Sequence, residues 1–293
     1  MNPFDLPGPA FLVFYAVFAI AVNVLFHRWR RSRESAGTVP DLSDPYEISY
    51  LRGGQEEALR VATVSLMDRG LLKQGDGGKV VAVGTGAAAK VRRPLERAIL
   101  EELAAPASPV DLLASGSLHK TAGACDPIKW DLETSGLLTT SRSVAARSLP
   151  YVLGLVLLVG VSGTKILVAL ARGKHNVEFL IFLTFASVLV LTAQLLARRT
   201  TSGDAALARA RHRFSALRDR ALSLSPGGQT NEAALLAAVF GLAVLPAMSF
   251  PFVREVFPKI SASANGGSSG CGGSGCGGGG DGGGCGGCGG CGG

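Results

Sequence analysis

Four apolar stretches, each close to the length of a membrane-spanning helix, dominate the hydrophobic pattern of this chain of 293 residues. Residues 11–26 carry no charge and, together with residues 8–10, approach the roughly 20 residues that cross a hydrocarbon core. Residues 149–171 and 179–197 form the second and third stretches, and the short separation between them favours an antiparallel hairpin of helices. The sequence therefore predicts at least three transmembrane helices.

The fourth stretch, residues 233–253, is rich in alanine and lies between Glu232 and Arg254. Pro246 and Pro251 interrupt it, so a helix at this position would be kinked. We expect this segment to cross the membrane as a fourth helix. The alternative is a helix that lies in the membrane interface.

Residues 44–140, between the first two spans, have the mixed polarity of a small soluble domain. Two segments in it, which end in Gly70-Leu-Leu72 and Gly136-Leu-Leu138, share the pattern L-x-x-x-G-L-L, and each closes an amphipathic stretch. Gly70 suits the left-handed residue that ends a helix. After the first segment, residues 73–83 resemble two short strands around an Asp-Gly-Gly turn. A helix, a glycine and a hairpin in this order predict a winged-helix-like unit.

The second half of the domain predicts a second, degenerate winged-helix-like unit. Pro94 suits a first helical turn, and further helices are expected at residues 109–114 and 127–136, the last capped by Asp126. The alternative to two tandem units is plain helical packing with one hairpin. Residues 44–140 contain 13 acidic and 11 basic residues, a balance that repels a polyanion, so we expect no nucleic-acid partner.

A basic amphipathic helix is predicted at residues 204–224, within a cytoplasmic segment at residues 198–232. Ser202 or Asp204 is expected to cap its start. Arginines occupy the other faces of this helix, and one face is apolar: Leu207, Ala210, Phe214, Leu217 and Ala221. Such a helix, tethered to the bilayer at both ends, is expected to bind anionic lipids of the inner leaflet. The alternative is that its apolar face packs on the soluble domain.

Composition and charge agree with a membrane protein and suggest its orientation. Hydrophobic residues make up 47% of the chain and charged residues only 17%, and the net charge is +7. The arginines cluster after the first span, before the second and after the third, which marks the cytoplasmic side of a bilayer. This pattern places the N-terminus outside, the soluble domain inside and, if residues 233–253 span, the C-terminal tail outside. The first span is interpreted as an uncleaved anchor, because its basic cluster follows the apolar run.

No enzyme constellation is evident in the sequence, so we expect neither catalysis nor a cofactor. The four histidines are scattered, and the Gly-x-Gly that begins at Gly84 lacks the rest of a nucleotide-binding motif. Lys165, within the second span, is expected to extend toward the membrane interface. Cys125 is expected to be a buried thiol in a reducing compartment.

The last 28 residues, 266–293, consist of Gly, Cys, Ser and one Asp, which predicts a disordered tail whose only chemistry is that of thiols. Five cysteines lie in it: Cys271, Cys276, Cys285, Cys288 and Cys291. Their spacing is compatible with zinc or iron ligands, with disulfide or thioether crosslinking, and equally with a low-complexity extension that has no role. An outside tail would favour disulfides, and five thiols cannot all pair within one chain.

Four features of the chain occur together: the stretch Asp44-Pro-Tyr-Glu-Ile-Ser-Tyr-Leu-Arg-Gly-Gly54, the stretch Pro94-Leu-Glu-Arg-Ala-Ile-Leu100, the central helical hairpin and the Gly/Cys-rich end. In these features the chain resembles a family of uncharacterised bacterial membrane proteins. The resemblance implies a bacterial inner-membrane location and no catalytic residues. The expected role is a structural or interaction component whose tail crosslinks, anchors or binds a protein partner; the alternative is a membrane-tethered metal or redox sensor.

The expected organisation combines membrane helices, a winged-helix-like domain and a disordered tail. Its parts are an anchor (1–26), a basic linker (27–43), the soluble domain (44–140), two spans (149–171 and 179–197), the basic amphipathic segment (198–232), the fourth span (233–253) and the tail (266–293).

Overall fold

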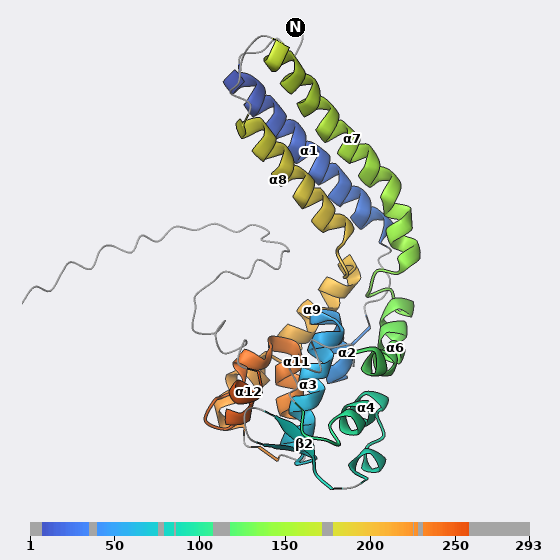
Figure 1. Ribbon diagram of the computed structural model, residues 1–293, viewed down its shortest axis with the longest axis vertical. Coiled ribbons are helices and arrows are strands. Elements are labelled where there is room, and N and C mark those ends of the chain that lie inside the picture. Colours follow the sequence, from blue (N-terminus) through green and yellow to red (C-terminus); the bar gives the residue numbers. More distant parts are fainter. Residues whose placement is uncertain are drawn as a thin grey trace, which may run out of the picture.

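The computed structural model describes residues 8–34, 40–75, 79–84, 86–107, 118–171, 178–224, 226–227 and 231–257. The described chain is mostly helical and has two parts, a long bundle of three helices and a helical domain at one end of it (Figure 1). The tail cysteines and the segment at residues 109–114 lie outside the described residues.

The bundle consists of α1 (Gly8–Arg33), α7 (Ser141–Ala171) and α8 (Glu178–Leu195). Each of the three is long and apolar enough to cross a membrane, as the sequence predicted. Large apolar side chains cover the outside of the bundle, which is the arrangement that a lipid environment favours. The exposed ones on α7 are Leu149, Val152, Leu153, Val156, Leu157, Val159, Leu167 and Leu170.

The interior of the bundle is a small aromatic and aliphatic cluster of Phe11, Tyr15, Ala19, Phe26, Leu158, Leu180 and Leu191. Tyr15 is fully buried, and its hydroxyl donates to the Leu158 carbonyl across 3.1 Å, so α1 and α7 are joined by a hydrogen bond as well as by packing. The Lys165 ammonium lies 4.7 Å from the centre of the Phe11 ring, at the end of the bundle remote from the domain. This position agrees with a lysine that reaches toward the interface.

The helical domain is built from two segments separated in sequence by the α7–α8 hairpin. The first contributes α2 (Pro45–Gly53), α3 (Gln55–Asp68), β1 (Leu72–Gln74), β2 (Val80–Ala82), η3 (Ala87–Lys90), α4 (Pro94–Glu102) and α6 (Leu118–Thr134). The second contributes α9 (Thr201–Arg213), α10 (Ser215–Asp219), η4 (Ala221–Ser223), α11 (Glu232–Phe240), η5 (Leu242–Val244) and α12 (Pro251–Val256). One continuous core includes side chains from both segments, so the domain extends well beyond the predicted residues 44–140.

The repeated L-x-x-x-G-L-L pattern has the same backbone geometry at both of its sites. Gly70 and Gly136 have φ values of +69° and +68°, in the left-handed region that ends helices. In each case the amide after the glycine bonds to the carbonyl five residues earlier, at 2.9 Å: Leu71 to Leu66 and Leu137 to Leu132. The pattern is therefore a helix stop used twice.

The two stops lead to different structures. After Gly70 the chain forms the predicted hairpin, in which β1 pairs antiparallel with β2 and Lys73 lies opposite Val81. After Gly136 it forms an isolated bridge between Leu138 and Arg199 and then enters α7. The expected start at Asp126 is wrong, because α6 begins at Leu118 and continues through Pro127.

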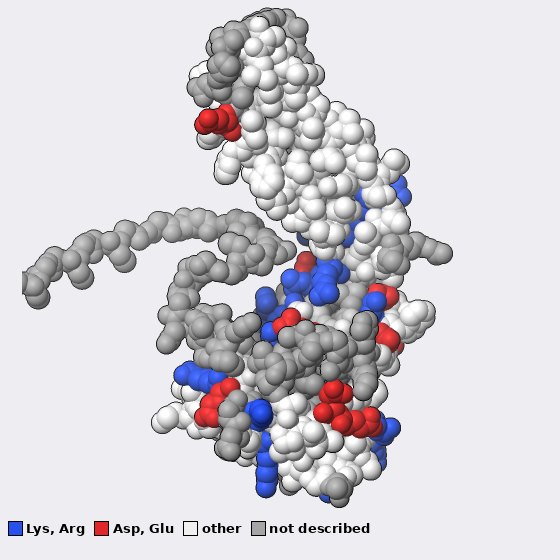
Figure 2. Space-filling view, in the orientation of Figure 1, with Lys and Arg blue, Asp and Glu red and all other residues white. Residues whose placement is uncertain are grey.

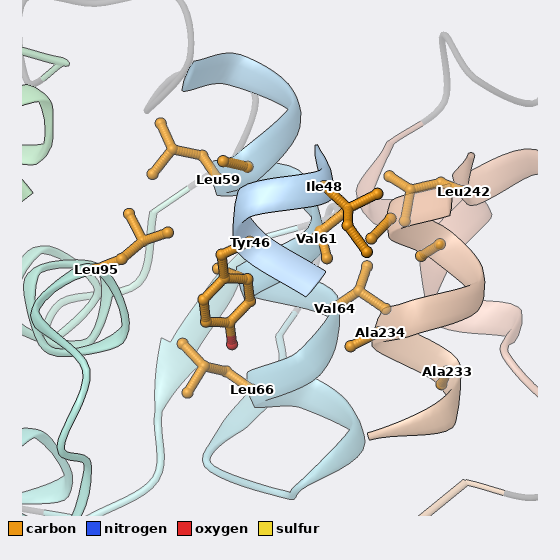
Figure 3. Close-up of a cluster of buried hydrophobic side chains, with 14 of the residues drawn as sticks. Tyr46, Ile48, Leu59, Val61, Val64, Leu66, Leu95, Ala233, Ala234 and Leu242 are labelled. Atoms are coloured by element: carbon orange, nitrogen blue, oxygen red, sulfur yellow. The ribbon is translucent and has the colours of Figure 1, made fainter. Parts of the chain in front are cut away.

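The predicted fourth span does not form as a long helix. Residues 233–253 are divided among α11, of nine residues, the short η5 and the first turn of α12, of six. Gly241, with φ +104°, ends α11, and Pro251 begins α12. Most of α11 is buried against α2 and α3, and Figure 3 shows Ala234 and Leu242 facing Ile48 and Val64. The apolar character of this segment serves the core of the domain.

The basic amphipathic segment also packs into the domain. It is divided into α9, α10 and η4, and the Thr200 hydroxyl caps α9 by accepting from the Gly203 N–H, so neither Ser202 nor Asp204 is the cap. The predicted apolar face contacts α2 and α11 in the core, with all its members buried or half-buried. The apolar face therefore packs on the domain, as the alternative predicted, and binding of residues 204–224 to anionic lipids stays a prediction.

Candidate functional site

A buried ionic cluster lies where the bundle meets the domain, and we call it the junction cluster. Its members are Arg30 and Glu34 of the first span and its end, Arg147 of α7, Gln194 of α8 and Thr201 at the start of α9. The side chains of Arg30, Glu34 and Arg147 are each less than one-tenth exposed.

Glu34 is the centre of the junction cluster. Its Oε1 lies 2.8 Å from Arg147 Nη2 and 3.2 Å from Arg30 Nε. Its Oε2 accepts from the Thr201 backbone N–H at 2.6 Å and from the Thr201 hydroxyl. One carboxylate thus contacts two spans and the first turn of α9, whose amides carry the positive end of the helix dipole.

Arg30 and Gln194 extend the cluster to the third span. Arg30 Nη1 donates to the Gln194 carbonyl at 3.0 Å, and the Gln194 amide donates to the Asn23 Oδ1 at 3.4 Å. Two arginines therefore share one carboxylate in a site with little solvent. Ion pairs in such surroundings are strong only when hydrogen bonds complete them, as the backbone and hydroxyl donors do for Glu34.

The junction cluster has a structural role, because it joins the bundle to the domain. Arg30, Arg147 and Glu34 pair with one another and with backbone groups, while Arg30 Nε and Arg147 Nη1 are buried without a hydrogen-bond partner. The cluster fixes the ends of three spans against α9, and α9 packs on α2 and α11 in the core. A displacement of one span would break contacts of Glu34 or Arg30, so the bundle and the domain are mechanically coupled.

A second polar cluster joins α2 to α4. Tyr46 donates its hydroxyl to Glu96 Oε1 at 2.6 Å, and Arg69 donates to Glu96 Oε2 at 2.9 Å. Arg93 pairs with Asp44, the N-cap of α2, at 2.6 Å, and its guanidinium stacks over the Tyr46 ring at 4.7 Å. Burial, together with the adjacent Glu96 carboxylate, raises the pKa of Tyr46. The cluster holds α4 to α2 inside the core.

Arg52 provides a third buried contact by capping the C-terminal end of α11. Its Nη1 donates to the Ala237 carbonyl at 3.0 Å, and its Nη2 pairs with Glu57. Burial lowers the pKa of Arg52, and Glu57 opposes that effect. A cation at the negative end of a helix dipole is favourable, so Arg52 helps to hold α11 in the domain and away from lipid.

Of the six cysteines considered in the sequence, the structure describes only Cys125. The five tail cysteines lie outside the described residues. Cys125 is buried in the core, as expected, and burial raises the pKa of its thiol to about 12. Across the described ranges, no group of three or more His, Cys, Asp and Glu side chains is placed to hold a metal ion.

The sequence did contain one signal for the junction cluster. Glu34 is the only acidic residue between residues 6 and 40, and it directly follows the run of arginines that ends the first span. An isolated acid in such a run favours an ion pair, although its partners at Arg147 and Thr201 are far away in sequence. Comparison of the chain with protein-family models, with curated proteins and with solved structures gave no match.

Proposed function

We propose that this protein is a membrane-anchored interaction component. The bundle of three spans holds the helical domain at one membrane face, and the domain carries the thiol-rich tail. The junction cluster is the observation that supports this role most, because it couples the spans to the domain through one buried carboxylate. The buried ionic contacts of the described residues are structural ones, which favours a non-enzymatic role.

We propose that the tail and the domain lie on the same side of the membrane. Three spans carry the chain across three times, and Phe257, the last described residue, is buried in the core of the domain. The arginines at the domain end of the bundle favour the cytoplasmic side of a bacterial inner membrane. This placement replaces the earlier expectation of an outside tail, which depended on a fourth span.

The placement changes the chemistry proposed for the tail. In the cytoplasm its five thiols would stay reduced, so a stable disulfide network is disfavoured. Reduced thiols can bind a protein partner, accept thioether modification or coordinate a soft metal such as zinc. The shared compartment therefore also favours the alternative function, a metal or redox sensor that acts through the domain.

The winged-helix-like interpretation remains part of the proposal. The sequence of α3, the glycine stop and the β1–β2 hairpin supports it, and the balanced charge of the domain favours a protein surface as the partner. On this proposal the hairpin would be a contact surface and would not bind nucleic acid.

Thiol labelling of intact cells tests the placement. One variant keeps Cys291 as its only cysteine, and a second has Met248→Cys as its only cysteine, at a domain position that is 97% exposed. We expect both to be protected from a membrane-impermeant maleimide until the cells are lysed. Labelling of Cys291 alone in intact cells would place the tail opposite the domain and contradict the proposal.

Metal analysis tests the alternative function. Protein purified under reducing conditions is expected to contain zinc or iron if the tail is a sensor. That metal should disappear when Cys285, Cys288 and Cys291 are replaced by serine, and it should remain when only Cys125 is replaced. Equal metal content in the wild type and the triple variant would remove the sensor function and leave the interaction role.

A further inference from the structure

Exposed arginines lie directly beyond the apolar surface of the bundle, at the end that meets the domain. On α1 the last exposed large apolar residue is Leu25, and Arg28, Arg31 and Arg33 follow it on exposed positions. After α8 the exposed Leu196 is followed by the exposed Arg198, whose guanidinium lies beside Gly54 of the domain. We call these four residues, Arg28, Arg31, Arg33 and Arg198, the arginine belt.

The apolar surface has the height of a hydrocarbon core. The exposed apolar side chains of α7 extend from Leu149 to Leu170, which is about 32 Å along the helix at 1.5 Å per residue. Arg147 precedes Leu149 by two residues, and Arg198 follows Leu196 by two, so the arginines of different spans begin at a common level. If the three helices cross a bilayer, this level would lie among the lipid headgroups.

The nearby acids are already engaged. Glu34 is buried in the junction cluster, and Asp204 pairs with Arg199 at 3.3 Å. Trp29 lies among the belt residues, and the Arg33 guanidinium is 5.5 Å from its ring centre, an aromatic position typical of a membrane interface. In Figure 2 the basic side chains gather between the bundle and the domain, and the bundle surface above them is almost uncharged.

We propose that the arginine belt binds the phosphate groups of anionic phospholipids in the leaflet that faces the domain. Arginine guanidinium groups pair with phosphate oxygens through two parallel hydrogen bonds, and such pairing is favoured at the dielectric boundary of the headgroup layer. This surface is separate from residues 204–224, whose apolar face is inside the domain. The proposal rests on the three helices crossing a membrane and is independent of the role proposed for the tail.

The experiment uses Trp29 as the reporter. The chain has two tryptophans, and Trp130→Phe removes the other one, which is exposed on α6. The full-length Trp130→Phe protein is reconstituted into vesicles that contain either brominated phosphatidylglycerol or brominated phosphatidylcholine. The quenching of Trp29 gives the relative affinity of the two lipids for the surface around the belt.

We expect phosphatidylglycerol to bind at least about tenfold more tightly than phosphatidylcholine, since each cation near an anionic surface contributes about fivefold. Replacement of the four belt arginines by glutamine should bring the ratio close to one. Replacement by lysine should preserve part of the preference, because lysine keeps the charge and loses the paired geometry. High salt should weaken the preference but should not abolish it.

A matched control removes the same number of positive charges from the far end of the domain. Lys73, Lys79, Lys90 and Arg92 are exposed there, near β1, β2 and η3, and replacing all four by glutamine should leave the lipid preference unchanged (Figure 1). Equal affinity for the two lipids in the Trp130→Phe protein would overturn the proposal. An equal loss in the control variant would also overturn it, because the preference would then follow net charge and not the belt.

Discussion

Glu34 accepts a hydrogen bond of 2.6 Å from the backbone N–H of Thr201, which lies 167 residues further along the chain. This contact joins the end of the first span to the start of a domain helix that follows the third span. Because the same carboxylate pairs with Arg30 and Arg147, the position of α9 depends on the relative positions of α1 and α7.

Replacing Glu34 by glutamine should destabilise the protein strongly. Arg30 and Arg147 would remain buried without a counter-charge, and removing one partner from a buried pair costs about 3 kcal/mol or more. The measurement is the unfolding midpoint of the purified protein in detergent, together with the rate at which a protease cleaves near the junction. Glu56→Gln is the matched control, because Glu56 pairs with Arg60 on the exposed surface of α3.

A second substitution tests whether the loss of stability comes from the unpaired arginine charges or from a change in side-chain packing. In the Glu34→Gln background, Arg147→Met removes one of the uncompensated charges and should recover part of the lost stability. Further destabilisation by the second change, additive with the first, would show that Arg147 and Glu34 do not act together.

Tyr46→Phe should weaken the attachment of α4 to α2. The substitution removes the hydroxyl that donates to Glu96 and leaves that buried carboxylate with one fewer donor, at a cost of about 2 kcal/mol. Glu96→Gln and the double variant complete a cycle whose coupling free energy measures the pair. Tyr50→Phe, a half-buried tyrosine of the same helix, is the control, and a loss as large as that of Tyr46→Phe would argue against a specific bond.

Gly203 and Gly123 should respond in opposite ways to alanine. A Cβ atom at Gly203 would lie 2.3 Å from the Leu137 carbonyl oxygen, so Gly203→Ala should cost on the order of 2 kcal/mol. A Cβ at Gly123, an exposed position in α6, meets nothing within 4 Å. Gly123→Ala should therefore stabilise the domain by about 0.5 kcal/mol through helix propensity, measured by denaturant unfolding.

Cys125 should react slowly with thiol reagents, and its protonation should affect stability only at alkaline pH. Burial raises its pKa to about 12 from 9.0, so the folded protein holds the thiol proton more tightly than the unfolded chain. The resulting stability is complete below about pH 9 and is lost as the pH rises toward 12. Tyr46, whose pKa is also raised, should add to this alkaline loss.

The measurement uses a variant in which the five tail cysteines are serine. At pH 8, labelling of Cys125 by iodoacetamide should be at least a hundredfold slower in the folded protein than in denaturant. Cys125→Ala should reduce the alkaline loss of unfolding free energy. Rapid labelling of the folded protein at pH 8 would contradict the burial of this thiol.

The three spans and the first helix stop could be predicted because their signals are local. An apolar run of about 20 residues and a glycine after an amphipathic stretch each specify a structure without reference to distant residues. The hairpin between Leu72 and Ala82 was predicted for the same reason. The helix–glycine–hairpin order was correct, although it did not extend to the second repeat.

The prediction of a fourth span was wrong because hydropathy does not distinguish a segment that faces lipid from one that is buried in a protein core. Residues 233–253 are apolar enough for either, and what decides is the fit of the alanines of α11 against α2 and α3. Pro246 and Pro251 were visible as helix breakers but were interpreted as kinks, and Gly241, which ends α11, was not considered. The junction cluster was missed because Glu34 meets Arg147 and Thr201 only through the tertiary fold.

The division of the domain into two chain segments has a consequence for biosynthesis. The surfaces of α2 and α3 that α11 covers are translated before α7 and α8, whereas α11 itself emerges only after both have been made. The first segment of the domain therefore keeps this apolar surface uncovered until α11 has been translated. The domain core can be completed only after both helices of the hairpin have left the ribosome.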